Sequence, residues 1–176
     1  MYYTGKGDDG TSNLLNPKIR IIKSDYIFEV LGSLDELNSW LGLCAVEAKS
    51  LPEILEIVKN IQNQLFICQA YFAEAKVVID VNLITATEEI IDRLSKLIKP
   101  KKSFILSGGS KLSVLFDVAR TLARKTERRA LQLQKIDKRQ VNSLVLAYLN
   151  RLSSLLYVLA RFVNELAKQE EEEPKY

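Results

Sequence analysis

Basic side chains are concentrated between residues 120 and 139. Arg120, Arg124 and Arg128 are spaced four residues apart, so on a helix they follow one face, with Glu127 beside them. Such a face is either simply solvated or binds a polyanion. A nucleic acid is one possible polyanion, but the stretch contains neither interleaved aromatic residues nor a recognised binding motif. A solvated face and a site for an anionic ligand therefore both stay open here, and we expect no nucleic acid.

A second candidate anion site lies at the start of the chain. Residues 3–12, YTGKGDDGTS, combine glycines, a lysine and hydroxyl groups, which are the components of a loop that binds phosphates. The Walker A pattern is absent, and a mobile Gly-rich terminus is the alternative interpretation. Residues 107–110, SGGS, precede the arginine-bearing helix. They predict either a simple helix cap or backbone amides that face an anion.

The chain contains no histidine. This excludes histidine-bound zinc, Ser-His-Asp and Cys-His nucleophiles, and imidazole general bases. Catalysis would have to use carboxylates, Lys, Arg, hydroxyls, backbone amides or the reactivity of a cofactor. The two cysteines, Cys44 and Cys68, lie in apolar runs without CxxC spacing, which indicates buried thiols in a reducing cytosol.

The 176 residues suit one domain, and apolar residues recur at helical spacing from Asp25 onward. The pattern predicts an all-α five-helix bundle at 25–168, between an N-terminal loop at 1–24 and an acidic tail at 169–176. We expect the tail to be frayed and solvated. The predicted helices cover 25–49, about 51–76 after a capping box at Ser50 and Glu53 with Pro52 in the first turn, 86–98 after a capping box at Thr85 and Glu88, 111–134 after Ser110, and a fifth through Leu166 capped by Asp137.

The sequence predicts neither a signal peptide nor a membrane-spanning segment. The first residues, MYYTGKGDDG, lack the charged start and apolar stretch of a signal peptide. No uncharged apolar run approaches the roughly 18 residues that a membrane span requires. We expect a cytoplasmic protein with no membrane partner.

Six segments resemble, in order and spacing, the PduO-like ATP:cob(I)alamin adenosyltransferases, a family of trimeric five-helix bundles. They are YTGKGDDGTS (3–12), Lys23-x-Asp25, GSLDELNSWLG (32–42), FILSGGS (104–110), ARTLARKTERR (119–129) and YLNRLSSLLYVLAR (148–161). The resemblance implies that cob(I)alamin attacks the 5′ carbon of ATP and that triphosphate leaves, giving adenosylcobalamin. Reduced cobalt is itself the nucleophile, so a protein without histidine can perform this reaction.

The resemblance also assigns residues. It places ATP against Thr4, Gly5, Lys6, Gly7, Ser12, Asn13, Lys23, Arg124, Lys125, Glu127, Arg128 and Asn150. It makes Arg120, Asp35 and Phe104 catalytic. Arg120 would pair with Asp35 across a subunit boundary in a homotrimer, and Phe104 would lie under the corrin ring, where it excludes the lower axial ligand. Core packing is the alternative interpretation of Phe104.

Some positions depart from the usual pattern of the family: Gly5 replaces a basic residue, Lys125 an arginine, Ser154 an aspartate and Phe116 a histidine. The alternative function is therefore a carrier or sensor that binds ATP and a corrinoid without efficient turnover. The resemblance further implies Mg²⁺ as a cofactor, whose ligands the sequence does not identify. A reductase and an adenosylcobalamin-dependent acceptor enzyme are possible partners.

Overall fold

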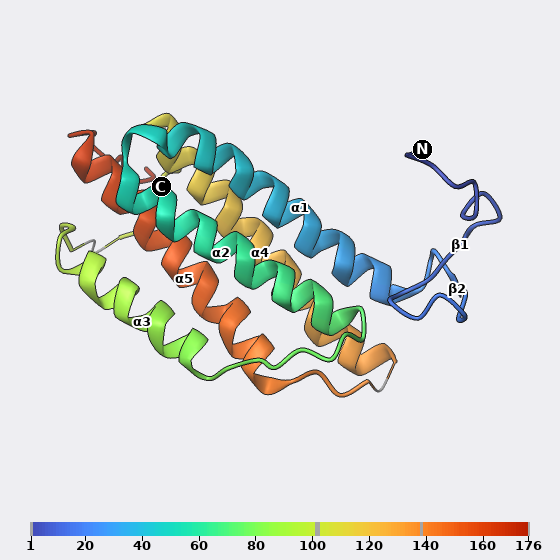
Figure 1. The fold of residues 1–176 in the computed structure, drawn as a ribbon. Helices are drawn as coiled ribbons and strands as arrows, with labels where there is room; N and C mark the ends of the chain where they lie inside the picture. The colour runs from blue at the N-terminus through green and yellow to red at the C-terminus, as the bar shows by residue number, and fades with distance from the viewer. Residues whose placement is uncertain (1, 101–102, 138, 176) are drawn as a thin grey trace.

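The structure, a computed structural model, describes residues 2–100, 103–137 and 139–175. Helix α1 packs against α2 and α4, and α5 packs against α3 and α4 (Figure 1). The predicted all-α five-helix bundle is confirmed. The helices are α1 (Tyr26–Glu47), α2 (Pro52–Phe72), α3 (Asn82–Ser95), α4 (Lys111–Ile136) and α5 (Ser143–Leu166), preceded by two short strands, β1 (Thr11–Ser12) and β2 (Ile21–Ile22).

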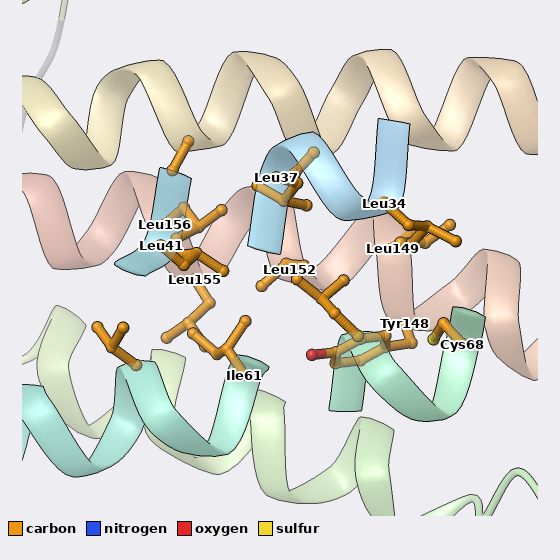
Figure 2. Close-up of a cluster of buried hydrophobic side chains, with 14 of the residues drawn as sticks. Leu34, Leu37, Leu41, Ile61, Cys68, Tyr148, Leu149, Leu152, Leu155 and Leu156 are labelled. Carbon is orange, nitrogen blue, oxygen red and sulfur yellow. The ribbon is translucent and has the colours of Figure 1, made fainter. Parts of the chain in front are cut away.

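Helix α5 is the centre of the core. Leu149, Leu152 and Leu156 of α5 face Leu34 and Leu41 of α1 in one apolar cluster (Figure 2). All five side chains are fully buried. Burial of such side chains contributes about 1.5–3 kcal/mol each, so this seam supplies much of the stability of the bundle.

By length and hydropathy alone α5 could also cross a membrane. Within the bundle, however, 56% of its apolar window is buried. Its side chains pack against α3 and α4, and it carries the buried, charged Arg161. The apolar character of α5 is therefore explained by its place in the core.

Side-chain hydrogen bonds fix how α1 lies against its neighbours. The buried hydroxyl of Thr126 on α4 donates to the carbonyl of Ser33 at 3.1 Å, and the indole of Trp40 donates to the carbonyl of Leu115 at 2.8 Å. On the other side, Asn38 and Gln62 exchange hydrogen bonds with each other's backbone carbonyls. These bonds hold the α1 face that carries Asp35 in a fixed relation to the α4 face that carries the arginines.

Both predicted capping boxes are wrong. Ser50 lies in a 3₁₀ turn, and α2 starts at Pro52 after Leu51, which makes no capping bond through its side chain. Helix α3 starts at Asn82, three residues before Thr85, because the Asp80 carboxylate accepts from the Asn82 amide at 2.9 Å. A proline with fixed φ begins one helix, and an aspartate upstream of the predicted cap begins the other.

The remaining helix ends were predicted with mixed success. Asp25 and Ser110 cap α1 and α4 through their side chains. Asp137 instead ends α4, and Asn142 caps α5, so the predicted role of Asp137 is wrong. Helix α2 ends at Phe72 and not near residue 76, because Glu74 adopts a left-handed conformation that turns the chain.

The acidic tail is not frayed along its whole length. Glu171 has a side chain that is only 5% exposed, and its carboxylate lies 2.9 Å from the Arg161 guanidinium. The carbonyl of Glu172 accepts from the amide of Leu106 at 2.9 Å. The buried Arg161 accounts for the difference, because a charge-assisted contact with its guanidinium stabilises the Glu171 carboxylate inside the bundle.

Candidate active site

The N-terminal segment precedes α1 and is joined to the bundle by the buried Leu14 and by the Leu15 amide, which donates to the Ala73 carbonyl at 3.3 Å. Strands β1 and β2 pair antiparallel, with Thr11 opposite Ile22, and the segment extends beyond the end of the bundle (Figure 1). All of the residues here that the resemblance assigns to ATP are described and close in sequence: Thr4, Gly5, Lys6, Gly7, Ser12, Asn13 and Lys23. The predicted N-terminal loop thus contains a short two-stranded hairpin.

Arg20 holds this segment together. Its guanidinium donates to the carbonyls of Lys6 and Thr11, the latter at 2.9 Å, and its Nε donates to the Thr11 hydroxyl at 2.8 Å. It also lies 3.3 Å from the Asp9 carboxylate. Sequence reasoning missed Arg20 because its partners are mostly backbone carbonyls, which leave no mark on spacing or composition.

The backbone conformation explains one glycine of the loop, and a close contact explains another. Gly5 has φ +68°, a left-handed conformation that costs a side-chain-bearing residue about 1–2 kcal/mol. A Cβ at Gly7 would lie 2.9 Å from the ammonium nitrogen of Lys23, which donates to the Gly7 carbonyl at 2.6 Å. Glycine at position 5 is therefore matched to this turn, and the following Lys6 supplies an exposed cation.

Asp9 stabilises the turn that follows. The side chain and the backbone amide of Thr11 both donate to its carboxylate, at 2.7 and 2.9 Å. These hydrogen bonds, with the charge of Arg20, lower the pKa of Asp9 below its ordinary value. The carboxylate is thus ionised at neutral pH, and its partners Thr11 and Arg20 lie within the N-terminal segment.

Two arginines on the exposed face of α4 have no acidic partner among the described residues. Among the described residues, Arg124 and Arg128 form no ion pair, although Lys125 pairs with Glu36 and Arg129 pairs with Glu29 at 2.9 Å. Arg124 and Arg128 are exposed and one helical turn apart. Two unneutralised guanidinium groups at this spacing match adjacent phosphates of a polyphosphate chain.

Glu127 and Asn150, both predicted to bind ATP, are brought together by α4 and α5. The Asn150 amide donates to the Glu127 carboxylate at 3.0 Å. Arg151 donates to the Asn150 side-chain oxygen at 3.0 Å and to Glu88 of α3 at 2.6 Å. The chain of hydrogen bonds fixes polar groups beside the unpaired arginines.

Arg120 is held by a buried carboxylate. Its Nε lies 3.6 Å from Asp117, whose other oxygen accepts from the Arg161 guanidinium at 2.6 Å. The Nε of Arg120 is buried and has no hydrogen-bond partner among the described residues. No ion pair joins Arg120 to Asp35 within the described protomer; Asp35 is exposed on α1.

Asp35 lies at the edge of a largely apolar groove. The groove has a volume of about 550 Å³ and lies between α1 and α2. Its lining includes Leu15 and Phe66, which are 60% and 63% exposed. Exposed apolar side chains around a single carboxylate are typical of a surface that binds a further molecule or chain.

Phe104 is 80% exposed in the loop between α3 and α4, so the core-packing interpretation is wrong. Within the same loop, the backbone amide and hydroxyl of Ser110 donate to the Asn164 side-chain oxygen at 2.9 and 3.0 Å. Gly109 has φ +87° and lies directly against Asn164. The SGGS segment is thus a cap that also fastens the loop to α5. The exposed ring of Phe104 lies in the same loop.

The candidate residues form separate groups in one protomer. Among the described residues, the hydrogen bonds of residues 2–13 stay within the segment that precedes α1, so none of them reaches the α4 arginines. Among the described residues there is also no cluster of three carboxylates or thiols that could hold a metal ion. Within one protomer, the structure therefore does not unite the N-terminal loop with α4.

Residues 2–163 match the sequence pattern of the cobalamin adenosyltransferase family. The chain belongs to this family. The chain is 36% identical over 169 residues to the corrinoid adenosyltransferase of Bacillus subtilis, with 92% of this chain and 86% of that protein covered. It is 38% identical over 174 residues to the corrinoid adenosyltransferase PduO of Citrobacter freundii, which covers 95% of this chain and 51% of that protein. The chain thus spans about half the length of that longer relative.

Solved structures from this family are close to the structure described above. A variant of the PduO-type ATP:corrinoid adenosyltransferase from Lactobacillus reuteri, complexed with cobalamin and ATP, aligns over 100% of both chains with a TM-score of 0.92 and 30% identity. A second variant, complexed with ATP, has a TM-score of 0.90 and 31% identity over 98% of this chain and 99% of that one. The family resemblance inferred from the six sequence segments is thereby confirmed.

Proposed function

We propose that this protein transfers the 5′-deoxyadenosyl group of ATP to the cobalt of cob(I)alamin or a related corrinoid. The cobalt electron pair forms the Co–C5′ bond, the C5′–O bond breaks, and inorganic triphosphate leaves with that bond's electrons. Cobalt changes formally from Co(I) to Co(III). The protein then needs to orient two substrates and to stabilise the charge on the leaving group, and neither task requires a histidine.

The observation that carries this proposal is the pair of unpaired arginines on α4. Arg124 and Arg128 keep their full charge on an exposed face, while the neighbouring Lys125 and Arg129 are neutralised by α1 carboxylates. A triphosphate leaving group develops negative charge that guanidinium groups stabilise by two-pronged hydrogen bonds. The arrangement thus favours a polyphosphate ligand over a merely solvated basic face.

The N-terminal segment would supply the second half of the nucleotide site. Thr4 and Lys6 would supply a hydroxyl and an exposed ammonium group, Gly5 and Gly7 would let a phosphate approach the backbone, and Ser12, Asn13 and Lys23 would complete this half. Arg20 holds this loop in shape before ATP arrives. Glu127 and Asn150 would contact the nucleotide beside Arg124 and Arg128, and Lys125 would join them by leaving Glu36.

Mg²⁺ fits this site as an ion held mainly by the phosphates of the substrate. The described residues offer no group of three metal-binding side chains. Mg²⁺ is commonly held by substrate phosphates and water with one or two carboxylates. When bound, it would supply further neutralisation of the triphosphate, and Glu127 is the nearest carboxylate to the arginine pair in sequence.

The site is completed between copies in a homotrimer. Two features support this part of the proposal: among the described residues, the buried Nε of Arg120 has no hydrogen-bond partner, and Asp35, at the edge of an apolar groove, has no ion pair. An Arg120–Asp35 pair formed across the boundary would satisfy both groups and cover the groove. The N-terminal loop would then reach the α4 arginines of a neighbouring copy.

Phe104 would lie against the lower face of the corrin ring. Its 80% exposure leaves the ring free to contact a ligand. An aromatic wall there excludes water and the lower axial ligand, and cobalt without that donor accepts an electron more easily. A reductase that supplies Co(I), a cytoplasmic location and an acceptor enzyme for the product complete the proposal.

The test is an anaerobic reaction of purified protein with Mg²⁺, ATP and chemically reduced cob(I)alamin. We expect adenosylcobalamin and triphosphate to accumulate in equal amounts, which absorbance spectra and chromatography would follow together. ATP binding without either product would contradict the proposal and support the carrier or sensor function.

A further inference from the structure

The chain reverses direction directly after α5. Lys168 adopts φ +51°, and the amide of Gln169 donates to the carbonyl of Asn164 at 2.9 Å. This bond spans five residues, as in a Schellman motif, and it sends the tail back along the bundle. The acidic residues therefore return toward the loop between α3 and α4.

Glu171 anchors the returning tail in a buried polar site. Its carboxylate lies 2.9 Å from the Arg161 Nε and accepts from the Asn164 amide at 3.1 Å. Arg161 is 2% exposed and Glu171 5%. Charged groups at this depth are costly unless they are paired, so the carboxylate and the guanidinium each stabilise the other's position.

The anchored tail holds the loop that bears Phe104. The Leu106 amide, two residues beyond Phe104, donates to the Glu172 carbonyl at 2.9 Å. From the other side, Asn164 donates to the Gly108 carbonyl at 3.1 Å and accepts from Ser110. The exposed ring of Phe104 is therefore carried on a backbone that is fastened both to α5 and to the tail.

The same buried cluster reaches the other candidate catalytic group. Arg161 donates to Asp117 at 2.6 Å, and Asp117 lies 3.6 Å from Arg120. Two arginines thus alternate with two carboxylates from Arg120 to Glu171. Removal of the Glu171 carboxylate would leave Arg161 and Asp117 to rearrange.

We propose that Glu171 is a positioning residue, which ties the C-terminal tail to Arg161 and thereby sets the height of Phe104 against the corrin ring. This inference rests on the proposed function, because Phe104 is assigned there to the lower face of the corrinoid. The ligand that the tail controls is consequently the corrinoid and not ATP. A loose loop would admit water or a lower ligand and would impair the use of Co(II).

Glu171→Ala tests this role, with Glu173→Ala as the matched control in the same tail. For Glu171→Ala we expect turnover that starts from Co(II) and a reductant to fall by about tenfold more than turnover from preformed Co(I). The KM for the corrinoid should rise and the KM for ATP should not. The absorbance bands of Co(II) without a lower ligand should weaken, and Glu173→Ala should match the parent protein.

Amide hydrogen exchange provides a readout that needs no activity. We expect exchange at residues 104–110 to accelerate in Glu171→Ala and to stay unchanged in Glu173→Ala. Equal losses from Co(II) and Co(I), or unchanged exchange in the loop, would overturn the role of Glu171. If the parent protein showed no adenosyl transfer, the proposed function would fail, while the exchange result would still decide whether the tail holds the loop. If Glu171→Ala did not fold, Glu171→Gln should show the same changes at smaller size.

Discussion

Arg124 and Arg129 lie on the same helix and differ in one respect: Glu29 neutralises Arg129, whereas Arg124 has no acidic partner among the described residues. Their charges are equal, but only Arg124 has an unoccupied guanidinium fork. The difference separates a residue that stabilises the packing of α1 on α4 from a residue available to a ligand. The sequence predicted Arg124 and Arg128 through the family motif, but it did not predict which basic residues of α4 are neutralised.

Arg124→Ala is expected to raise the KM for ATP by about 10- to 100-fold, the size of one charge-assisted hydrogen bond. Arg129→Ala should change this KM by less than about twofold, because its charge is already paired. Steady-state kinetics with varied ATP would measure both. Arg124→Lys should recover only part of the loss, since an ammonium cannot form the fork. Equal effects of the two alanine variants would contradict the assignment.

The cysteines behave as the sequence predicted. Cys44 and Cys68 are free and fully buried, and burial raises the pKa of each thiol to about 12. Above an ordinary value of 9.0, the unfolded chain loses these protons while the folded chain retains them. Unfolding then releases protons, so the free energy of unfolding contributed by the thiols is intact below pH 9 and decreases as the pH rises from 9 toward 12.

We therefore expect urea-unfolding midpoints to decrease across this alkaline range by less in the Cys44→Ala, Cys68→Ala double variant than in the parent protein. Iodoacetamide should leave both thiols unmodified in the folded protein at neutral pH and should react after unfolding. Rapid modification of the folded protein would show that one of the thiols is accessible.

At the scale of elements, the predictions succeeded where apolar periodicity decides and at the Ser110 cap, and failed where one polar group competes with another nearby. The five helices follow from runs of Leu, Ile and Val at helical spacing. Helix starts at Asn82 and Ser143 depend on Asp80 and Asn142, which compete with equally plausible caps at Thr85 and Asp137. The docking of Glu171 depends on a buried arginine from a different element, which local sequence cannot indicate.

The turn before α4 gives a sharp test of how the Phe104 loop is fastened. Gly109→Ala should destabilise the protein by about 2–4 kcal/mol, because of its left-handed backbone and the close approach to Asn164. A Cβ there would lie 2.5 Å from the Asn164 side-chain oxygen. Gly108→Ala is the control, since its nearest neighbour would lie 3.9 Å away. Urea unfolding would measure both, and equal destabilisation would contradict the packing described.

Phe104→Ala should leave stability nearly unchanged, because the ring buries little area in the protomer. Its effect should appear in the reaction instead, as a loss from Co(II) with a reductant that exceeds the loss from preformed Co(I). Parallel assays from the two cobalt states would measure this. Equal losses would show that Phe104 does not act by excluding a lower ligand.

For the whole molecule, the protomer holds the parts of the site without uniting them. The N-terminal segment projects from the bundle (Figure 1). The α4 arginines, Asp35 and Phe104 belong to α4, to α1 and to the loop between α3 and α4. The motifs alone predicted the candidate residues, because each motif is local in sequence. Their assembly could not be read from local patterns, since under the proposed function it requires contact between copies of the chain.

Mixed assemblies test this central claim most directly. Arg120→Ala and Asp35→Ala should each abolish most adenosyl transfer while circular dichroism shows unchanged helix content. When the two inactive variants are co-expressed, boundaries that receive Arg120 from one chain and Asp35 from the other should regain function. Random mixing in equal amounts predicts about a quarter of the parent activity. Mixed trimers confirmed by native mass spectrometry that remain inactive would contradict a site shared between subunits.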